Sequence, residues 1–329
     1  MRSRLADVTD SLLEIPVVPS FTSIGPAVRS RLEGWTPLGH YDMSGRVVVL
    51  TGPTSGLGLS AAHTLAEMGA SLVLVGRDRA RTEAVRDGLA LADGAAPHSV
   101  VLADMSDLAQ VRTAARAILD DRDAIDVLVH NAGALSAERT VAPSGLETTV
   151  AAQVVGPFLL TSLLLDALRA ARPGRVVTVS SGGMYATGLT VENLQMGERD
   201  YAGAEQYARA KRAQVTLTEM WAQRWGGPDV VFHSAHPGWA DTPGVRSSLP
   251  RFRRLTAPLL RSAEAGADTV VWLSADDEPL SVNGLFWHDR RPRSLHRLPT
   301  TRRTDTPHRR EQLWDWVSAA AAADQALTA

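Results

Sequence analysis

The chain has 329 residues, of which 44% are hydrophobic, and its net charge of −2 creates no global field that would recruit nucleic acid or an anionic membrane. It contains no cysteine, which excludes disulfides, thiolate catalysis and cysteine-based metal sites and fits a reducing cytoplasm. The N-terminus lacks a signal-peptide pattern, and the longest apolar region, residues 157–168, is too short to span a bilayer. We therefore expect a cytoplasmic protein with no transmembrane segment and no nucleic-acid partner.

Residues 1–43 precede the first predicted strand and are expected to form an N-terminal arm. Apolar residues recur at helical spacing at Leu5, Val8, Leu12 and Ile15. Prolines end this pattern, and a second short helix is expected over residues 26–33. The favoured interpretation is a helical arm packed on the surface of its own domain. The alternative is an arm that rests on a membrane or binds a partner.

A buried strand is predicted over residues 46–50, followed by a glycine-rich turn and a helix. The turn reads Thr51-Gly52-Pro53-Thr54-Ser55-Gly56-Leu57-Gly58. In this context the backbone N–H groups at the helix start face an anion, and the missing side chains let a pyrophosphate approach. The cofactor contacts predicted in this turn are Thr51, Gly52, Thr54, Ser55, Gly56, Leu57 and Gly58.

The second predicted strand, residues 71–75, ends in Gly76-Arg77-Asp78. Sites for NAD usually have an acidic side chain at this strand end, which accepts a hydrogen bond from the ribose 2′-OH. Here Arg77 follows a glycine, and a guanidinium pairs well with a 2′-phosphate. The sequence therefore predicts NADP (NADPH) as the cofactor. The alternative is that Arg77 is a solvated loop charge and that Asp78 accepts the ribose hydrogen bond.

Two further predicted strands end in polar residues at the edge where open α/β sheets bind ligands. The strand over residues 99–103 ends in Asp104, which either accepts a hydrogen bond from an adenine amino group or caps the helix over residues 108–119. The strand over residues 125–129 leads to His130 and then to Asn131-Ala132-Gly133.

The remaining elements are expected in this order: a helix over 145–171, strands over 175–179 and 230–235 with a helix from about 205 between them, a helix over 263–274, and a short strand over 284–288. Alternating strands and helices predict an α/β fold with a single doubly wound, mostly parallel sheet of Rossmann type. We expect a catalytic domain over 44–290 and a tail over 291–329. Residues 290–310, at the start of this tail, are expected to be a surface excursion and 311–323 a terminal helix. The helix over 145–171 has an apolar face broad enough for a subunit interface, so a homodimer or homotetramer is expected.

Tyr207 and Lys211 form the most informative pair in the chain. Lys211 is the only lysine among 34 basic residues, which indicates a position where a guanidinium cannot replace an ammonium. On a helix the two side chains rise from one face, a turn apart. An ammonium close to a phenol favours the phenolate and lowers its pKa, which would make Tyr207 a general acid/base.

These motifs together resemble the short-chain dehydrogenase/reductase family. The resemblance rests on TGPTSGLG after the first strand, NAG after the fourth, a serine after the fifth, YARAK on the next helix and HPG after the sixth. It covers about residues 44–290. Further stretches, among them VSSGGM, HPGWADTPGVR and AGADTVVWL, resemble the dehydrogenase/reductase member 12 type, in which a similar arm precedes the core.

The resemblance implies a role for each matched position. Tyr207 would donate and accept the proton, Lys211 would hold the nicotinamide ribose and lower the Tyr207 pKa, and Ser181, rather than Ser180, would bind the substrate carbonyl. The cofactor positions implied beyond the first turn are Asn131, Ala132, Gly133, Pro237, Gly238 and Thr242, the last at the nicotinamide carboxamide. Gln153 departs from the pattern, because the family usually has an asparagine there that supports a water-linked proton relay to the lysine.

The function expected from the sequence is hydride transfer between NADP(H) and a carbonyl or alcohol, with no metal. The alternative is a redox-silent use of the scaffold, as a non-redox isomerase or cyclase or as a cofactor-binding interaction protein, which the change at Gln153 keeps open. A serine hydrolase is disfavoured, because no GxSxG elbow surrounds Ser181. Apolar loop residues suggest a lipophilic substrate. They are Met184, Tyr185, Leu189, Leu194, Met196, Tyr201, Trp239, Val245, Leu249 and Phe252.

Overall fold

The computed structural model of the chain describes residues 4–242, 246, 253–254 and 256–326. Its centre is an eight-stranded sheet with the strand order β3-β2-β1-β4-β5-β6-β7-β8. The strands are β1 (Val47–Thr51), β2 (Ser71–Gly76), β3 (Ser99–Leu102), β4 (Val127–His130), β5 (Gly174–Val179), β6 (Val230–Ala235), β7 (Phe286–His288) and β8 (Arg291–Arg293). All neighbours pair in parallel except β7 and β8, which form an antiparallel hairpin. The prediction of a doubly wound, mostly parallel sheet is confirmed.

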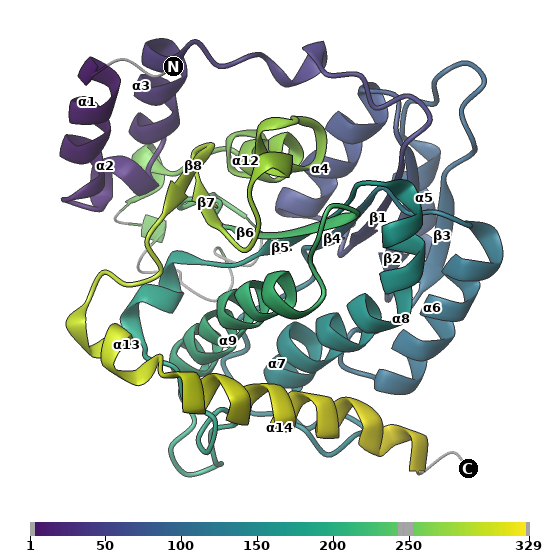
Figure 1. Cartoon of the computed structure of the whole chain (residues 1–329), viewed down its shortest axis with the longest axis vertical. Coiled ribbons are helices and arrows are strands. Elements are labelled where there is room, and N and C mark those ends of the chain that lie inside the picture. The colour runs from purple at the N-terminus through teal and green to yellow at the C-terminus, as the bar shows by residue number, and fades with distance from the viewer. Residues whose placement is uncertain (1–3, 243–245, 247–252, 255, 327–329) are drawn as a thin grey trace.

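Helices cover both faces of this sheet (Figure 1). One face packs against α4 (Gly56–Glu67), α5 (Arg79–Asp87) and α12 (Ala263–Ala275). The other packs against α6 (Leu108–Asp121), α8 (Gly156–Ala171) and α9 (Gly203–Arg224). The central strands are buried from both sides, which explains why they read as continuous apolar runs rather than as alternating patterns.

The helix predicted over 145–171 begins later and is not uniform. It consists of α7 (Thr148–Val150), a π-helical turn η2 (Ala151–Val155) and α8. The π turn inserts an extra residue, which sequence periodicity does not reveal, and such turns often occur at functional sites. Among the described residues, Thr148–Ala171 is the one helical stretch long and apolar enough to cross a membrane. However, 78% of its most apolar window is buried inside the fold.

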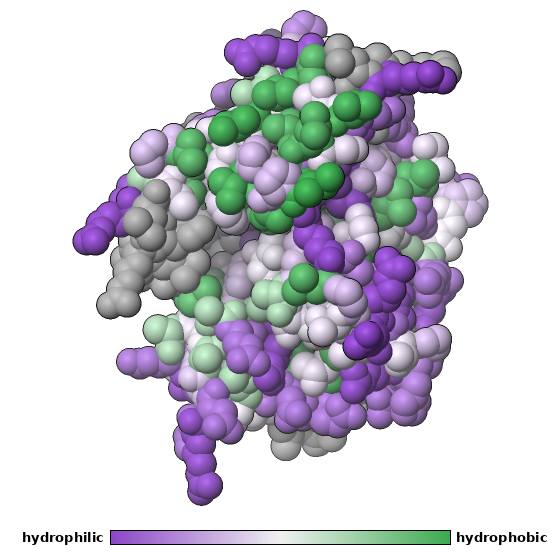
Figure 2. All heavy atoms as spheres, turned by 90° about the vertical axis from the view of Figure 1, so that its left-hand side faces the viewer, coloured by the Kyte–Doolittle hydropathy of each residue, from purple (hydrophilic) through white to green (hydrophobic). Residues whose placement is uncertain are grey.

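The N-terminal arm consists of α1 (Arg4–Glu14), α2 (Val18–Phe21) and α3 (Ile24–Glu33), and it lies beside β7 and β8 (Figure 1). It contacts the sheet with its polar side. Asp10 pairs with Arg293 at 2.6 Å, and Glu33 pairs with Arg291 at 2.7 Å. The helically spaced residues Val8, Leu12 and Ile15 instead face outward, and hydrophobic residues gather on this outer surface (Figure 2). Those more than 40% exposed are Val8, Leu12, Ile15 and Val18.

The expectation that residues 290–310 are a surface excursion holds only in part, because its first two residues are buried and most of the others are exposed or half-buried. Arg290, in the turn before β8, and Arg291, the first residue of β8, are buried, because carboxylates of the arm and of α12 neutralise them. The segment continues through α13 (Pro299–Thr304) into α14 (Pro307–Ala326), which begins four residues before the predicted terminal helix and packs against α8 and α9. Four short 3-10 helices complete the described structure: η1 (Leu38–His40), η3 (Gly182–Ala186), η4 (Ala257–Leu259) and η5 (Glu278–Ser281).

Candidate active site

The predicted site residues lie in the loops and helices that follow the carboxyl ends of β1 to β6, on one edge of the sheet. The strand order reverses between β1 and β4, which is where doubly wound sheets bind their ligands. Thr51 and Asn131 join these two strands. The Thr51 hydroxyl donates to Val129 O and accepts from the N–H groups of Asn131 and Ala132, both at 3.0 Å. The Asn131 side chain donates to the carbonyls of Thr51 and Gly52 at 3.0 and 2.9 Å, so its amide holds the glycine-rich turn against β4.

The turn that opens α4 requires glycine at two positions. Gly52 has a φ of 68°, in the left-handed region. A Cβ on Gly58 would lie 2.1 Å from the Gly52 carbonyl oxygen, so the helix could not approach the turn with any side chain there. The Ser55 side chain forms no capping bond at the start of α4. The first N–H groups of the helix are therefore available to an anion, which fits a pyrophosphate.

The sequence left two alternative roles for Asp78 and for Asp104. In the structure both carboxylates accept hydrogen bonds from backbone N–H groups. Asp78 accepts from the N–H of Arg81 at 3.0 Å and caps α5, while Arg77 is exposed. Asp104 accepts from the Ser106 N–H and hydroxyl at 2.9 and 2.7 Å, whereas the cap of α6 is Asp107. Asp104 therefore shapes the turn before the helix rather than capping the helix itself.

Ser181, Tyr207 and Lys211 converge at the end of β5. The Ser181 hydroxyl accepts from the Gly183 N–H at 3.1 Å, and Ser181 lies close enough to the Tyr207 phenol to lower its pKa. Lys211 Nζ lies 5.3 Å from the centre of the Tyr207 ring and donates to Val179 O at 2.9 Å. Lys211 is buried, whereas Ser181 and Tyr207 are each partly exposed. The structure therefore brings an amine, a phenol and an alcohol together at the end of β5.

Burial is the main cause of the pKa shifts of Tyr207 and Lys211. It raises the pKa of Tyr207 to about 12, which the hydrogen bond with Ser181 only partly opposes. It also lowers the pKa of Lys211 to about 7. In the protein alone the phenol pKa is thus raised rather than lowered, because a dry environment penalises the charged form of both groups.

Gln153 lies beside the lysine, in the π turn η2. Its Nε2 donates to Ala134 O at 2.7 Å, whereas its Oε1 is buried and has no hydrogen-bond donor among the described residues. A Cβ on Gly133 would lie 3.1 Å from this Oε1 and 3.4 Å from Lys211 Nζ. An unsatisfied carbonyl oxygen and the ammonium therefore flank the same glycine.

His236, in the HPG loop, has a structural role. Its Nδ1 accepts from the N–H groups of Gly182 and Gly238 at 3.1 and 3.3 Å, which links the loops after β5 and β6. Burial holds the pKa of His236 well below its usual value, so the ring is neutral. Pro237 and Gly238 lie in this loop, and the Thr242 N–H donates to Ala240 O at 2.9 Å.

Most of the described side chains that were expected to wall a lipophilic pocket pack into the protein instead. Leu189 and Leu194 belong to the main core, and Met184 and Tyr185 to a smaller cluster around Phe21. Met196 is also buried, while Tyr201 and Trp239 are partly exposed. Val245, Leu249 and Phe252 lie outside the described residues.

Sequence reasoning missed residues that support these loops. Arg212 is fully buried and donates to the carbonyls of Met184, Thr187 and Leu295 at 2.8, 3.2 and 3.0 Å. Gln206 is also fully buried and donates to Leu194 O at 2.9 Å. Phe21 reaches the site from the arm. Arg212 and Gln206 adjoin the catalytic motif, but no local pattern distinguishes a buried arginine or glutamine from a solvated one.

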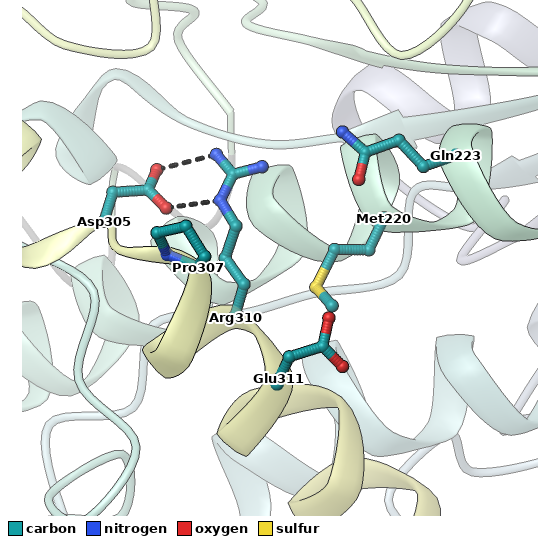
Figure 3. A pocket seen from close by; sticks show the side chains of 6 residues that line it. All are labelled: Met220, Gln223, Asp305, Pro307, Arg310 and Glu311. Atoms are coloured by element: carbon teal, nitrogen blue, oxygen red, sulfur yellow. Dashed lines mark hydrogen bonds and ion pairs between the residues drawn. The ribbon is translucent and has the colours of Figure 1, made fainter.

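A hollow of about 390 Å³ lies far from this group, between α9 and α14 (Figure 3). It is lined by Met220, Gln223, Asp305, Pro307, Arg310 and Glu311. Met220 and Tyr207 both belong to α9 and lie about 20 Å apart along its axis, since an α-helix rises about 1.5 Å per residue. The hollow is therefore separate from the candidate active site.

The sequence is similar to those of proteins of known family. The family model for short chain dehydrogenase matches residues 46–251. The human dehydrogenase/reductase SDR family member 12 is 38% identical over 270 residues, covering 82% of this chain and 84% of the relative. Human retinol dehydrogenase 12 is 30% identical, covering 84% and 90% respectively. DnrU of Streptomyces sp. (strain C5), named as a candidate daunorubicin C-13 ketoreductase, is 34% identical, covering 87% and 96%.

Solved structures share the fold. A Mycobacterium paratuberculosis protein superposes with a TM-score of 0.69 at 26% identity, covering 87% of this chain and 97% of that one. A Beutenbergia cavernae protein solved with bound NADP superposes with a TM-score of 0.60 at 27% identity, covering 77% and 97%. The predicted resemblance, including its likeness to the member 12 type, is confirmed. The chain belongs to the short-chain dehydrogenase/reductase family of oxidoreductases, which bind a nicotinamide cofactor and act on small molecules.

Proposed function

We propose that the protein is an NADP(H)-dependent oxidoreductase that interconverts a carbonyl and an alcohol on a lipophilic small molecule. The observation that carries this proposal is the convergence of Ser181, Tyr207 and Lys211 at the end of β5. The arrangement offers a hydroxyl to steady a substrate oxygen, a phenol to move its proton, and a cation to support the phenol.

The residues around the glycine-rich turn suit the cofactor. Uncapped N–H groups at the start of α4 would receive its pyrophosphate. The ammonium of Lys211 has three N–H donors and Val179 O as a protein acceptor, so it retains donors for ribose hydroxyls. When bound, the reduced cofactor supplies a hydride to the substrate carbon. Tyr207 delivers the proton to the substrate oxygen, and Ser181 donates a hydrogen bond to that oxygen as negative charge develops.

Arg77 supports the preference for NADP(H). It is exposed at the end of β2 and has no ion-pair partner among the described residues, while Asp78 already serves as a helix cap. Arg77→Ala should weaken NADPH binding by about 1.5–3 kcal/mol and leave NADH binding nearly unchanged, because a charged hydrogen bond to the 2′-phosphate is lost. Equal losses for both cofactors would assign Arg77 a structural role.

Two observations support the lipophilic substrate class. Trp239 is partly exposed beside the site, and relatives are named for retinol and for a daunorubicin ketone. A homo-oligomer and a cytoplasmic location complete the proposal. Helix α14 packs against α8, so a subunit interface on this side of α8 would have to include α14 as well.

The decisive experiment is NADPH oxidation by purified protein with a panel of apolar and charged ketones and aldehydes. Turnover should favour the apolar compounds and collapse in Tyr207→Phe, which removes one oxygen and leaves NADPH affinity intact. Undiminished turnover in that variant would refute the role of Tyr207. Lys211→Arg should also be impaired, since a guanidinium is too broad for the ribose contact.

Gln153 favours the second candidate, a redox-silent use of the scaffold. The extra methylene of Gln153 displaces its amide from where an asparagine would hold it, which argues against the proton relay. The unsatisfied Oε1 beside Lys211 nevertheless suits a bridging water, which argues for the relay. If the protein is a working reductase, Gln153→Asn should preserve or raise turnover. If the site has been repurposed, neither wild type nor Gln153→Asn should oxidise NADPH with any carbonyl of the panel.

A further inference from the structure

Phe21, an aromatic residue of the N-terminal arm, packs against the loops that carry the candidate catalytic residues. It is 4% exposed, and its ring centre lies 4.3 Å from that of His236 and 5.8 Å from that of Trp239, edge-on in both cases. A Cβ on Gly182 would lie 2.7 Å from a carbon of the Phe21 ring. The ring is therefore in direct contact with the residue that follows Ser181.

Backbone bonds attach the same part of the arm to the loop after β6. The Trp239 N–H donates to Phe21 O at 2.7 Å, and the Ser23 N–H donates to Leu259 O at 2.9 Å. The Arg261 side chain donates to Phe21 O at 3.1 Å. Three residues of this loop are thus bonded to α2 and to the residues just after it.

His236 connects Phe21 to the turn that follows Ser181. Its Nδ1 accepts from the N–H groups of Gly182 and Gly238, so one imidazole joins the loop after β5 to the loop after β6. Phe21 packs against that imidazole, with the two rings at 75° to each other. Without the ring, both the imidazole and the Ser181–Gly182 turn would lose a packing partner.

The arm itself is held by buried charges. Arg29 of α3 pairs with Asp289 and with Asp10, and Arg261 pairs with Asp289 at 2.6 Å. Arg261 also donates to the Ser20 carbonyl, next to Phe21. The position of the Phe21 ring is therefore fixed from the hairpin side as well as from the loop side.

We infer that Phe21 is a positioning residue for the active site: it holds the Ser181–Gly182 turn and the HPG loop in the geometry that sets Ser181 beside Tyr207. The inference rests on the proposed carbonyl reduction. Because Phe21 is buried and reaches the site through Gly182 and His236, it acts on Ser181 and not on the substrate directly. The N-terminal arm is then part of the catalytic apparatus.

The test compares Phe21→Leu and Phe21→Ala with Phe158→Leu. Phe158 is a matched control, since it is 5% exposed and packs against Trp221, Trp225 and Trp314, away from the catalytic group. We expect kcat/KM for the best ketone to fall about 10-fold in Phe21→Leu and about 100-fold in Phe21→Ala, because small displacements of reacting groups are costly. The NADPH Kd should change by less than about twofold in these variants, and Phe158→Leu should keep its kcat/KM.

Amide hydrogen exchange gives a readout that does not depend on turnover. Peptides covering residues 180–188 and 236–240 should exchange faster in Phe21→Leu than in wild type, and should not do so in Phe158→Leu. Unchanged exchange and unchanged kcat/KM in both Phe21 variants would overturn the inference, as would an equal loss of kcat/KM in Phe158→Leu. A wild type without turnover refutes the proposed reaction instead, while the exchange data still decide whether Phe21 holds these loops.

Discussion

The two ends of the chain are attached to the same sheet domain by opposite means. The N-terminal arm lies against the β7–β8 hairpin and is held mainly by charged side chains. The C-terminal helix α14 lies across α8 and α9 and is held mainly by apolar and aromatic side chains (Figure 1).

The arm is joined to the hairpin by a buried network. Arg29 is 1% exposed and contacts carboxylates of Asp10, Glu14 and Asp289. Asp289 and Arg290 form the hairpin turn with φ values of 53° and 52°, which non-glycine residues rarely adopt. Ion pairs from α3 and α12 engage both of these turn residues.

The helix α14 contributes to the main core. Leu313 and Val317 are fully buried, and Trp314 packs 5.2 Å from Phe158 and 5.1 Å from Trp225, measured between ring centres. Such packing depends on area and volume, whereas a buried ion pair depends on distance and direction. Ionic docking therefore fixes one orientation of the arm, which suits a segment that supports an active site. Apolar docking mainly adds stability.

The largest effect is expected from Arg29→Ala. Removing this guanidinium leaves buried carboxylates without a counter-charge, which should lower the free energy of unfolding by about 3–5 kcal/mol. Urea denaturation measures this change. Arg31→Ala on the same helix is the control, since Arg31 is exposed and should cost less than about 0.5 kcal/mol. Similar costs for both variants would mean that the buried network contributes no more than a surface arginine.

Leu313→Ala tests the apolar contacts that attach α14 to the sheet domain. Truncating a fully buried leucine should cost about 2–4 kcal/mol through lost burial and the cavity that remains. Turnover and NADPH affinity should stay near wild type at a temperature where the variant is folded. Asp315→Ala, at an exposed position of the same helix, should change neither stability nor activity. A selective loss of catalysis in Leu313→Ala would contradict the division of roles between the two ends.

As the pH falls, the N-terminal arm should open from the sheet domain before α14 does. Burial alone would raise the pKa of Asp10, but hydrogen bonds and charges from Arg293 and Arg29 outweigh it and hold the pKa at about 2. The pKa of Asp289 is also depressed, by His288, Arg261 and Arg29. A depressed carboxylate pKa stabilises the fold fully above the unfolded pKa of about 4, and this stability is lost as pH falls toward the folded pKa.

The loss for Asp10 should amount to about 2 kcal/mol. Hydrogen exchange compared at pH 6 and pH 3, corrected for intrinsic rates, should show opening in α1 and α3 and continued protection in the buried turns of α14. Equal opening of both ends at pH 3 would show that the carboxylates do not control the docking of the arm.

The smallest effect is expected from Glu311→Gln. This residue forms an ion pair between α14 and Arg224, but the two side chains are 59% and 34% exposed. Solvent screens such pairs, so the cost should be about 0–1 kcal/mol. The Arg224 guanidinium also stacks 4.2 Å from the Trp314 ring and should stay there after the substitution. A cost as large as that of Arg29→Ala would remove the distinction between buried and exposed ionic contacts in this protein.

Much of the candidate site could be predicted because its chemistry is local. The turn from Gly52 to Gly58 and the pair Tyr207 and Lys211 lie within single strand–turn–helix or helical segments, so residue spacing dictates their geometry. The pKa of Tyr207 could not be predicted in this way. It depends on how much water surrounds the phenol once distant loops have packed around it.

The sequence by itself determined the order of strands and helices, the sheet type, the family and the residues at the strand ends, because these follow from periodicity and from motifs a few residues long. Only the tertiary structure decided that Arg290 and Arg291 are buried, that the outward side of α1 is the apolar one, and that Phe21 touches the turn after Ser181. The physical reason is that each of these features joins residues far apart in the chain. Arg29 and Asp289 are separated by 260 positions. Whether an arginine is solvated or buried is decided by the partner that folding brings to it.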